Sequence, residues 1–267
     1  MKTALTIAGS DCSGGAGIQA DLKTMTVHGV YGMSVITALT AQNTTGISAI
    51  YKVTEEFLKQ QMDSIFTDIV PDAVKIGMVV SASFAEIIAE RLCYYQANNI
   101  VFDPVLSSTS KTMLFEQDGI ETLEKRLFPI ARLITPNLLE AERFVNRKLN
   151  TKKKIEEAAI EMGKRFGCSV LLKGGHSTNN IKQANDFLYE FDTDRKIWIN
   201  GVRYLASNTH GTGCTLSSAI VSNLAKGIGL EESVRLAKAY LNGAFQNEIY
   251  LGKGNGPLNH IYMEVEK

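Results

Sequence analysis

Short apolar runs alternate with longer amphipathic stretches along the whole chain. An apolar run of about four to eight residues bounded by turn residues indicates a buried strand, whereas apolar positions at helical spacing indicate a helix. Val234, Ala237 and Leu241, for example, fall on one helical face. The pattern predicts strands at residues 4–8, 34–41, 73–76, 100–102, 133–135 and 170–172, and helices at residues 16–28, 55–68, 82–96, 138–145, 154–166, 215–225 and 230–248.

Strands that are separated by helices need crossover connections. The order therefore predicts an α/β fold with a mostly parallel central sheet and helices on both faces. One stretch differs, because segments 184–191 and 196–204 flank the turn Asp192-Thr193-Asp194-Arg195, which is typical of a hairpin. We expect this hairpin to add a small antiparallel edge. No linker or low-complexity tract interrupts the chain, so residues 1–267 are expected to form one domain.

The charge balance excludes several classes of partner. The 28 basic and 28 acidic side chains give a formal net charge of zero, so there is no general attraction to nucleic acid or to an anionic membrane. Four cysteines and four histidines show neither CxxC nor HExxH spacing, which argues against zinc and favours free thiols in a reducing cytosol. The N-terminal apolar run is too short for a signal peptide, and no run reaches membrane-spanning length. We expect a cytoplasmic protein.

Polar and glycine residues follow each predicted strand. In a parallel sheet the carboxyl ends of the strands lie along one edge, and ligands bind there. The segments that follow successive strands are 9–17, 42–44, 77–78, 103–105, 136–137 and 173–176. We expect these segments to form one shared site.

The segment 207–215, Ser-Asn-Thr-His-Gly-Thr-Gly-Cys-Thr, is a glycine-rich turn before a predicted helix. Such a turn directs several backbone N–H groups and the positive end of the helix dipole to one spot, which favours a phosphate or an oxyanion. The same field is expected to lower the pKa of the Cys214 thiol. The alternative is a helix start with a buried cysteine, and this segment alone does not decide between the two.

A second glycine cluster contains Gly15-Ala16-Gly17-Ile18-Gln19-Ala20, a formal match to the dinucleotide-binding fingerprint. The context argues against that function. Asp11 separates the motif from the preceding strand, and no acidic residue ends the second predicted strand. There is no GxxxxGK[ST] motif either. Asp11 either caps the next helix or accepts hydrogen bonds from a ligand hydroxyl or amino group.

Three polar positions near later strand ends have two interpretations each. Asn137 and Glu140 share a helix face and have the spacing of a capping box. With Asp103 nearby they could also hold hydrated Mg²⁺, which commonly binds protein through one or two carboxylates. Lys173 ends a predicted strand before two glycines, so its ammonium reaches either solvent or a phosphate.

With these residues assembled, the chain resembles the ribokinase-like superfamily. Within it, the chain is similar to the hydroxymethylpyrimidine/phosphomethylpyrimidine kinases of thiamin synthesis, a branch that also contains bacterial pyridoxal kinases. The matching segments follow one another in order along nearly the whole chain: residues 8–23, 37–44, 75–78, 103–105, 135–137, 140, 172–176, 209–214 and 256–260. The resemblance implies a three-layer ribokinase-like fold and a homodimer. It also implies transfer of the γ-phosphoryl group of ATP to 4-amino-5-hydroxymethyl-2-methylpyrimidine and to its monophosphate.

The resemblance implies a role for each matching position. The residues expected around the pyrimidine are Asp11, Gln42, Met78 and Val105. Those expected to form the anion hole are Gly211, Thr212, Gly213 and Cys214. The ATP phosphates are expected near Lys173, Asn137 and Thr212, with adenine contacts near Pro257, and Mg²⁺ near Asn137, Glu140 and Asp103.

The role of Cys214 has two interpretations, because many relatives on this fold carry an aspartate base at that position. A thiol, with a reference pKa of about 8.5, becomes a competent base only where its surroundings lower that value. In the other interpretation Cys214 contributes mainly its backbone N–H. A weak base could suffice if proton loss comes late in a loose transition state.

A lid-like segment at residues 106–112 bears on the substrate. The pyridoxal kinases of this branch typically carry a second cysteine there, and a thiol adds readily to an aldehyde. This chain has small hydroxyl residues instead, which favours the pyrimidine. The alternative enzyme is a pyridoxine/pyridoxal kinase. A non-catalytic sensor is the alternative from another class, and the presence of Asp11, Lys173 and the 211–214 turn argues against it.

Overall fold

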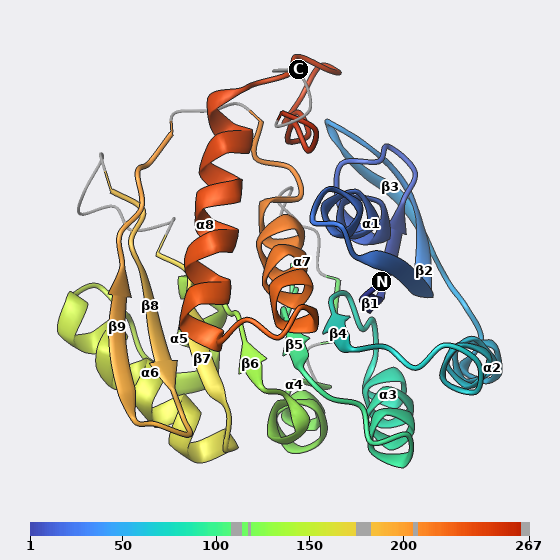
Figure 1. Cartoon of the computed structure of the whole chain (residues 1–267), viewed down its shortest axis with the longest axis horizontal. Helices are drawn as coiled ribbons and strands as arrows, with labels where there is room; N and C mark the ends of the chain where they lie inside the picture. Colours follow the sequence, from blue (N-terminus) through green and yellow to red (C-terminus); the bar gives the residue numbers. More distant parts are fainter. Residues whose placement is uncertain (108–113, 117–118, 175–182, 205–207, 263–267) are drawn as a thin grey trace.

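One mixed sheet runs through the molecule (Figure 1). The computed structural model describes residues 1–107, 114–116, 119–174, 183–204 and 208–262. Within these residues the strand order is β3-β2-β1-β4-β5-β6-β7-β8-β9. The strands are β1 (Thr3–Asp11), β2 (Tyr31–Asn43), β3 (Gly46–Lys52), β4 (Ala73–Ile76), β5 (Ile100–Phe102), β6 (Leu133–Ile134), β7 (Ser169–Leu172), β8 (Asp186–Glu190) and β9 (Arg195–Ile199).

The central strands are parallel and both edges are antiparallel. Strands β2, β1, β4, β5, β6 and β7 pair in parallel, as the alternation of strands and helices predicted. The hairpin β8–β9 forms one antiparallel edge, which confirms the sequence prediction. Strand β3 forms a second antiparallel edge against β2, which the sequence analysis missed.

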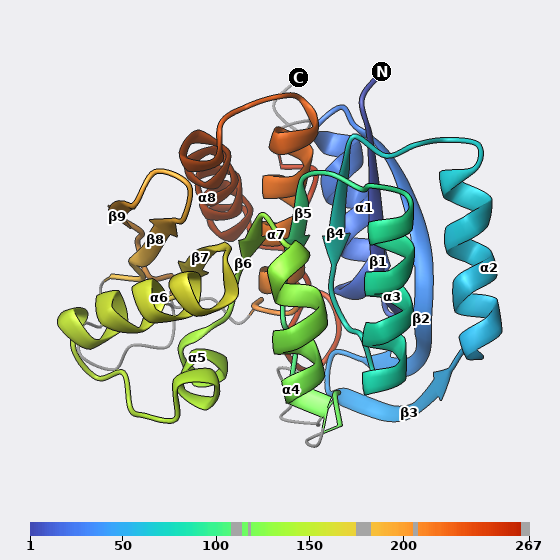
Figure 2. The same cartoon turned by 90° about the horizontal axis from the view of Figure 1, so that it is seen from below.

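Helices cover both faces of the sheet (Figure 2). Helices α1, α7 and α8 share a hydrophobic core with one face, where Ala4, Val101 and Leu133 point. The remaining helices pack on the other face, where Leu5, Phe102 and Ile134 point. The helical segments are α1 (Gly17–Val27), α2 (Glu55–Phe66), α3 (Ala82–Tyr94), α4 (Ile120–Thr122), η2 (Leu123–Leu127), η3 (Phe128–Ile130), α5 (Leu138–Val145), α6 (Lys152–Phe166), α7 (Thr212–Ala225) and α8 (Leu230–Gln246).

Two differences from the sequence prediction affect the site. Helix α7 begins at Thr212, three residues before the predicted start at residue 215, so that Gly213 and Cys214 belong to its first turn. Strand β2 extends to Asn43 because its end pairs with β3, and Gln42 is therefore a strand residue rather than part of a following loop. The helical segments between residues 120 and 130 were not predicted at all.

None of the helices in the described parts of the chain is long and apolar enough to cross a membrane.

Candidate active site

The carboxyl ends of the central strands bring together residues from distant parts of the chain. Asp103 follows β5 and Lys173 follows β7, and Lys173 Nζ donates to Asp103 Oδ1 at 2.6 Å. Thr135 Oγ1 donates to the same oxygen at 2.9 Å. A Cβ atom added to Gly213 would lie 3.0 Å from Asp103 Oδ2 and 3.4 Å from Lys173 Nζ. The first turn of α7 therefore lies directly beside a lysine and a carboxylate.

The N-terminus of α7 is held against the first glycine cluster. Gly211 caps the helix with φ +80°, and a Cβ atom there would lie 1.9 Å from the Gly15 carbonyl oxygen. Only glycine tolerates both the positive φ and the close approach of the Gly15 carbonyl oxygen. The N–H groups of a first helical turn have no acceptor within the helix. The Thr212 N–H donates to Thr209 O at 3.4 Å, and the turn as a whole lies beside the Lys173 ammonium. Together the turn and the ammonium form a spot that favours an anion.

Cys214 lies half-buried in this first turn. Burial raises the pKa of its thiol, and this effect outweighs the Lys75 ammonium and a hydrogen bond from the Gly17 backbone N–H, which both lower it. The expected lowering of the thiol pKa by the helix terminus is therefore wrong in its net direction. The carboxylates of Asp21 and Asp103 raise the same pKa further.

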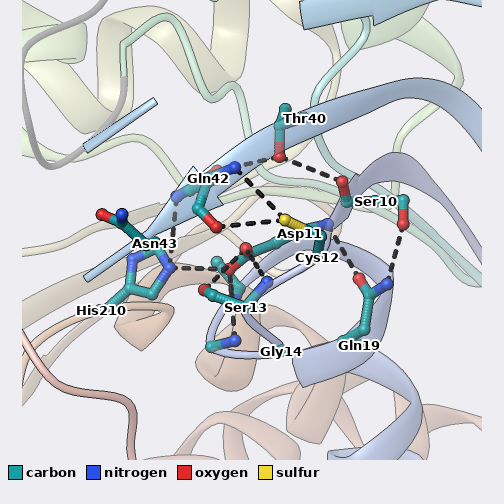
Figure 3. Close-up of polar contacts among 12 residues, drawn as sticks. Ser10, Asp11, Cys12, Ser13, Gly14, Gln19, Thr40, Gln42, Asn43 and His210 are labelled. Carbon is teal, nitrogen blue, oxygen red and sulfur yellow. Dashed lines mark hydrogen bonds and ion pairs between the residues drawn. The ribbon is translucent and has the colours of Figure 1, made fainter. Parts of the chain in front are cut away.

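The Asp11 carboxylate is surrounded by hydrogen-bonding groups of neighbouring residues (Figure 3). Ser13 donates to Oδ1 through its N–H and its hydroxyl, both at 2.8 Å. Oδ2 accepts the N–H groups of Gly15 and Ala16 at 3.2 and 2.9 Å, and it lies 2.8 Å from His210 Nε2. Burial alone would raise the pKa of Asp11, but the bonds from His210 and Ser13 outweigh it and hold the pKa at about 2.

This geometry gives Asp11 a structural role in the loop before α1 rather than direct ligand binding, although its side chain does not cap the first turn of α1. Five hydrogen bonds use the acceptor positions of the carboxylate, and only 3% of the residue is exposed. The carboxylate thus organises the glycine loop that leads into α1.

His210 lies between Asp11 and Gln42 (Figure 3). Its Nε2 atom is 3.2 Å from Nε2 of Gln42, whose Oε1 accepts the Thr40 hydroxyl at 3.0 Å. The backbone N–H of His210 donates to Gly256 O at 3.2 Å, in a short bridge that also places Pro257 beside it. Gln42 and Pro257, two of the predicted site residues, are thus both neighbours of one histidine that the sequence analysis gave no role.

Met78 and Val105, the other predicted pyrimidine contacts, follow the adjacent strands β4 and β5. Met78 is buried, and its sulfur lies 2.9 Å from where a Cβ atom on Gly9 would be. Val105 is half-buried, and its N–H donates to Asp103 O at 2.8 Å. Both residues therefore line the same edge of the sheet as Asp103.

Asn137 and Glu140 form the capping box that their spacing suggested. The Asn137 side chain accepts the Glu140 N–H at 2.9 Å, and Glu140 Oε2 accepts the Asn137 N–H at 2.8 Å. Burial raises the pKa of Glu140 to about 7, with Lys173 opposing this effect and Asp103 adding to it. Within the described residues there is no cluster of three or more His, Cys, Asp or Glu side chains that could hold a metal.

A hydrated divalent cation nevertheless fits the pair of acids. Asp103 Oδ2 faces the start of α7, and Glu140 is a buried acid whose charged form is disfavoured. A cation that keeps most of its waters needs only one or two such carboxylates, and its charge would favour their ionised forms.

A buried ion pair that was not predicted from the sequence, Lys75 and Asp21, lies beneath this site. Both side chains are fully buried, and their charged atoms are 2.7 Å apart. A signal was present, because Lys75 is the third residue of the otherwise apolar strand Ala73–Ile76. A lysine in a strand covered on both faces needs a buried acidic partner.

Comparison with known proteins identifies the family. The family model described as phosphomethylpyrimidine kinase matches residues 11–259. The chain belongs to the phosphomethylpyrimidine kinase family. The resemblance noted in the sequence is thereby confirmed, and so is the expectation of a kinase.

Two curated relatives show how far this similarity extends. The thiamine biosynthesis bifunctional protein ThiED of Geobacter sulfurreducens is 44% identical over 257 residues, which cover 96% of this chain and 52% of that protein. The chain thus spans about half the length of that relative. The hydroxymethylpyrimidine/phosphomethylpyrimidine kinase of Rhizobium meliloti is 44% identical over 262 residues, which cover 97% of each chain.

Solved structures have the same fold. Phosphomethylpyrimidine kinase from Clostridium difficile matches with a TM-score of 0.79 at 43% identity and covers 91% of this chain and 99% of its own. An ADP complex of Bacillus subtilis pyridoxal kinase matches with a TM-score of 0.89 at 32% identity and covers 99% of each chain. The expected three-layer, ribokinase-like architecture is confirmed. The sequence identity to the pyridoxal kinase, 32%, is lower than the 43% to the phosphomethylpyrimidine kinase.

Proposed function

We propose that this chain transfers the γ-phosphoryl group of ATP to 4-amino-5-hydroxymethyl-2-methylpyrimidine and then to its monophosphate. The observation that carries the proposal is the first turn of α7, which opens beside Lys173 and Asp103. Phosphoryl transfer depends on positioning and on charge stabilisation, which backbone donors and a lysine provide. The names of the relatives supply the substrate class.

ATP is the proposed phosphoryl donor. The Bacillus subtilis relative binds ADP, and its chain matches this one over nearly its whole length. We assign the phosphates to Lys173, Asn137 and the turn from Gly211 to Cys214, with Thr212 in its centre. Pro257, beside His210, is assigned to the adenine side.

Mg²⁺ is the proposed metal, held by Asp103 and Glu140 largely through water, with Asn137 fixing the helix that carries Glu140. When bound, it would neutralise charge on the phosphates. The capping box sets the position of Glu140, and Thr135 sets that of Asp103.

Cys214 is the proposed acceptor of the substrate proton. The hydroxyl oxygen forms a bond to the γ-phosphorus, the bond from that phosphorus to the ADP oxygen breaks, and its electron pair leaves with ADP. The O–H proton passes to the Cys214 sulfur in its thiolate form. Because burial raises the thiol pKa, the groups that oppose this effect matter for the step.

Pyridoxal phosphorylation is the second candidate, supported by the TM-score of 0.89 to the Bacillus subtilis pyridoxal kinase. The absence of cysteine from residues 106–112 argues against it. Residues 108–112 of that segment, like residues 175–176 and 207 of the predicted site, lie outside the described residues.

The deciding experiment measures ADP release with the pyrimidine alcohol, its monophosphate, pyridoxine and pyridoxal. We expect turnover with the pyrimidine alcohol and its monophosphate, with a kcat/KM far above that for pyridoxine or pyridoxal. A preference for pyridoxal would replace the pyrimidine assignment. Tight binding without turnover on any of the four would favour the sensor.

A cytoplasmic location, a single domain over residues 1–267 and a homodimer complete the proposal. The cysteines Cys12, Cys93, Cys168 and Cys214 are all free, which suits a reducing compartment. One continuous sheet runs from β1 to β9, and helices α7 and α8 share a hydrophobic core with it.

A further inference from the structure

Helices α1 and α7 meet below the anion hole along two matched faces. Gly17 and Asp21 are one turn apart on α1, and Cys214 and Ser218 are one turn apart on α7. The Gly17 N–H hydrogen-bonds to Cys214, and the Ser218 hydroxyl donates to Asp21 Oδ1 at 2.7 Å. The two contacts together fix how the Cys214 sulfur sits relative to Asp21.

Lys75 enters this interface from the sheet. Its Nζ atom lies 2.8 and 2.7 Å from the two oxygens of Asp21, and both side chains are fully buried. A Cβ atom on Gly77 would lie 2.9 Å from the same Nζ. The ammonium is therefore located under the carboxyl end of β4, at the edge of the sheet that carries the site.

The ion pair lies close to the sulfur, because Ser218, which donates to Asp21, is one helical turn from Cys214 on α7. Thr6 and Ser218 donate to the Asp21 carboxylate at 2.6 and 2.7 Å, so hydroxyl groups and Lys75 share its negative charge. The effect of Lys75 on the Cys214 pKa exceeds the opposite effect of Asp21. This order is expected when the ammonium is the nearer of the two charges.

Other charged groups face Cys214 as well. Burial is the largest influence and raises its pKa, and Asp103, which follows β5, adds to that effect. Lys173, which follows β7, also interacts with the sulfur, but its ammonium is paired with Asp103 at 2.6 Å. Lys75 is likewise paired, with Asp21, but its side chain is fully buried, whereas the Lys173 side chain is 17% exposed at the site.

We propose that Lys75 is a positioning residue for phosphoryl transfer, because its ammonium, held by Asp21, stabilises negative charge on the Cys214 sulfur. The catalytic consequence rests on the proposed function, whereas the effect on the sulfur is a property of the folded chain. A purely structural role is the competing explanation. In that explanation the pair serves only to join β1, α1, α7 and β4, because Asp21 also accepts the hydroxyl groups of Thr6 and Ser218.

The test is the pH dependence of Cys214 alkylation by iodoacetamide, followed peptide by peptide with mass spectrometry. The variant is Lys75→Met with Asp21→Asn, since removing Lys75 alone would leave a buried unpaired carboxylate. We expect the pH midpoint of Cys214 alkylation to rise by about one unit. At a pH below both midpoints, alkylation of the variant should then be about tenfold slower than that of the wild type. Cys12 and Cys93, which are both exposed, serve as internal references and should not change.

The matched control is the other buried lysine–aspartate pair, Lys238 and Asp186. Lys238→Met with Asp186→Asn should leave the Cys214 midpoint unchanged. If circular dichroism shows that the Lys75 variant does not fold, Ser218→Ala replaces it. That change removes one donor from Asp21, draws the ammonium toward the carboxylate and should raise the midpoint by a smaller amount.

An unchanged Cys214 midpoint in the folded variant, or an equal shift in the control, overturns the proposal. Alkylation of Cys214 does not require turnover. The experiment can therefore refute the role of Lys75 without refuting the proposed function, and the reverse. A wild-type protein that phosphorylates no alcohol refutes the proposed function alone. An active wild type with an unchanged midpoint in the Lys75 variant refutes the role of Lys75 alone.

Discussion

The Asp11 carboxylate owes its low pKa to hydrogen bonds that form only in the folded chain. A folded-state pKa of about 2, against 3.8 for the free side chain, contributes about 2 kcal/mol of stability above pH 4. Because the pKa is lowered, this contribution is complete at neutral pH and is lost as the pH falls from about 4 to about 2.

Asp11→Asn should therefore lower the free energy of unfolding by about 2 kcal/mol at pH 7, and by about half as much at pH 3. Urea unfolding at the two pH values measures the difference. Asp192→Asn, at an exposed position in the β8–β9 turn, is the control and should change stability by less than about 0.5 kcal/mol. An Asp11 effect that does not depend on pH would contradict the assignment to an ionised carboxylate.

The sulfur of Cys214 can be tested separately from its backbone. Cys214→Ala keeps the N–H in the first turn of α7 but removes the proton acceptor, so kcat should fall by about 10²–10⁴. Cys93→Ala, at an exposed position on α3, should leave kcat unchanged. Near-normal turnover in Cys214→Ala would assign this position to the anion hole alone.

At the scale of elements, the central sheet could be predicted and its edges only in part. Strands β1, β4, β5 and β7 are buried apolar runs, so local sequence identifies them. Strand β3 is half-exposed or exposed along its length and carries no such signal. Its conformation depends on pairing with β2, a tertiary effect that local pattern does not contain.

The candidate active site could likewise be predicted only in part. Glycines, Asp103 and Lys173 follow strand ends, and topology alone predicted that they would meet. The role of His210 could not be predicted, because it depends on Gly15, which leaves room for the ring: a Cβ atom there would lie 2.4 Å from His210 Cδ2. Such packing between distant loops is set only when the whole chain folds.

Two glycines that flank α7 allow the effect of backbone strain to be measured separately from that of a close contact. Gly211 and Gly227 have φ values of +80° and +83°, but only Gly211 has an atom within 4 Å of its absent Cβ. Gly227→Ala should cost about 1–2 kcal/mol of stability and leave kcat/KM unchanged. Gly211→Ala must also displace the Gly15 carbonyl, so kcat/KM should fall at least about tenfold beyond any loss of stability. Thermal unfolding and ADP release measure the two effects, and equal behaviour of the variants would contradict this account.

At the scale of the molecule, the β2–β3 edge presents apolar side chains to solvent. Leu39 and Tyr51 are direct partners across the two strands and are 47% and 70% exposed. A free sheet edge with such residues favours association. We predict sedimentation at about twice the 29.3 kDa of one chain.

Tyr51→Lys should shift that equilibrium to the monomer, whereas Tyr94→Lys, on α3 and also 70% exposed, should not. A wild-type monomer at micromolar concentration would contradict the homodimer. Equal dissociation in both variants would move the interface away from this edge.

The contacts that join the β1–α1 region to the start of α7 also bear on how the chain is made. Asp11 and His210 are 199 residues apart in sequence, and Asp21 and Ser218 are 197 apart. At about 5–20 residues per second, the ribosome delivers α7 on the order of ten to forty seconds after α1. Until then Lys75 and Asp21 remain in contact with water, and one face of the nascent parallel strands lacks its cover. Late closure of such distant contacts makes folding slow, so the nascent chain depends on protection from aggregation until its last quarter emerges.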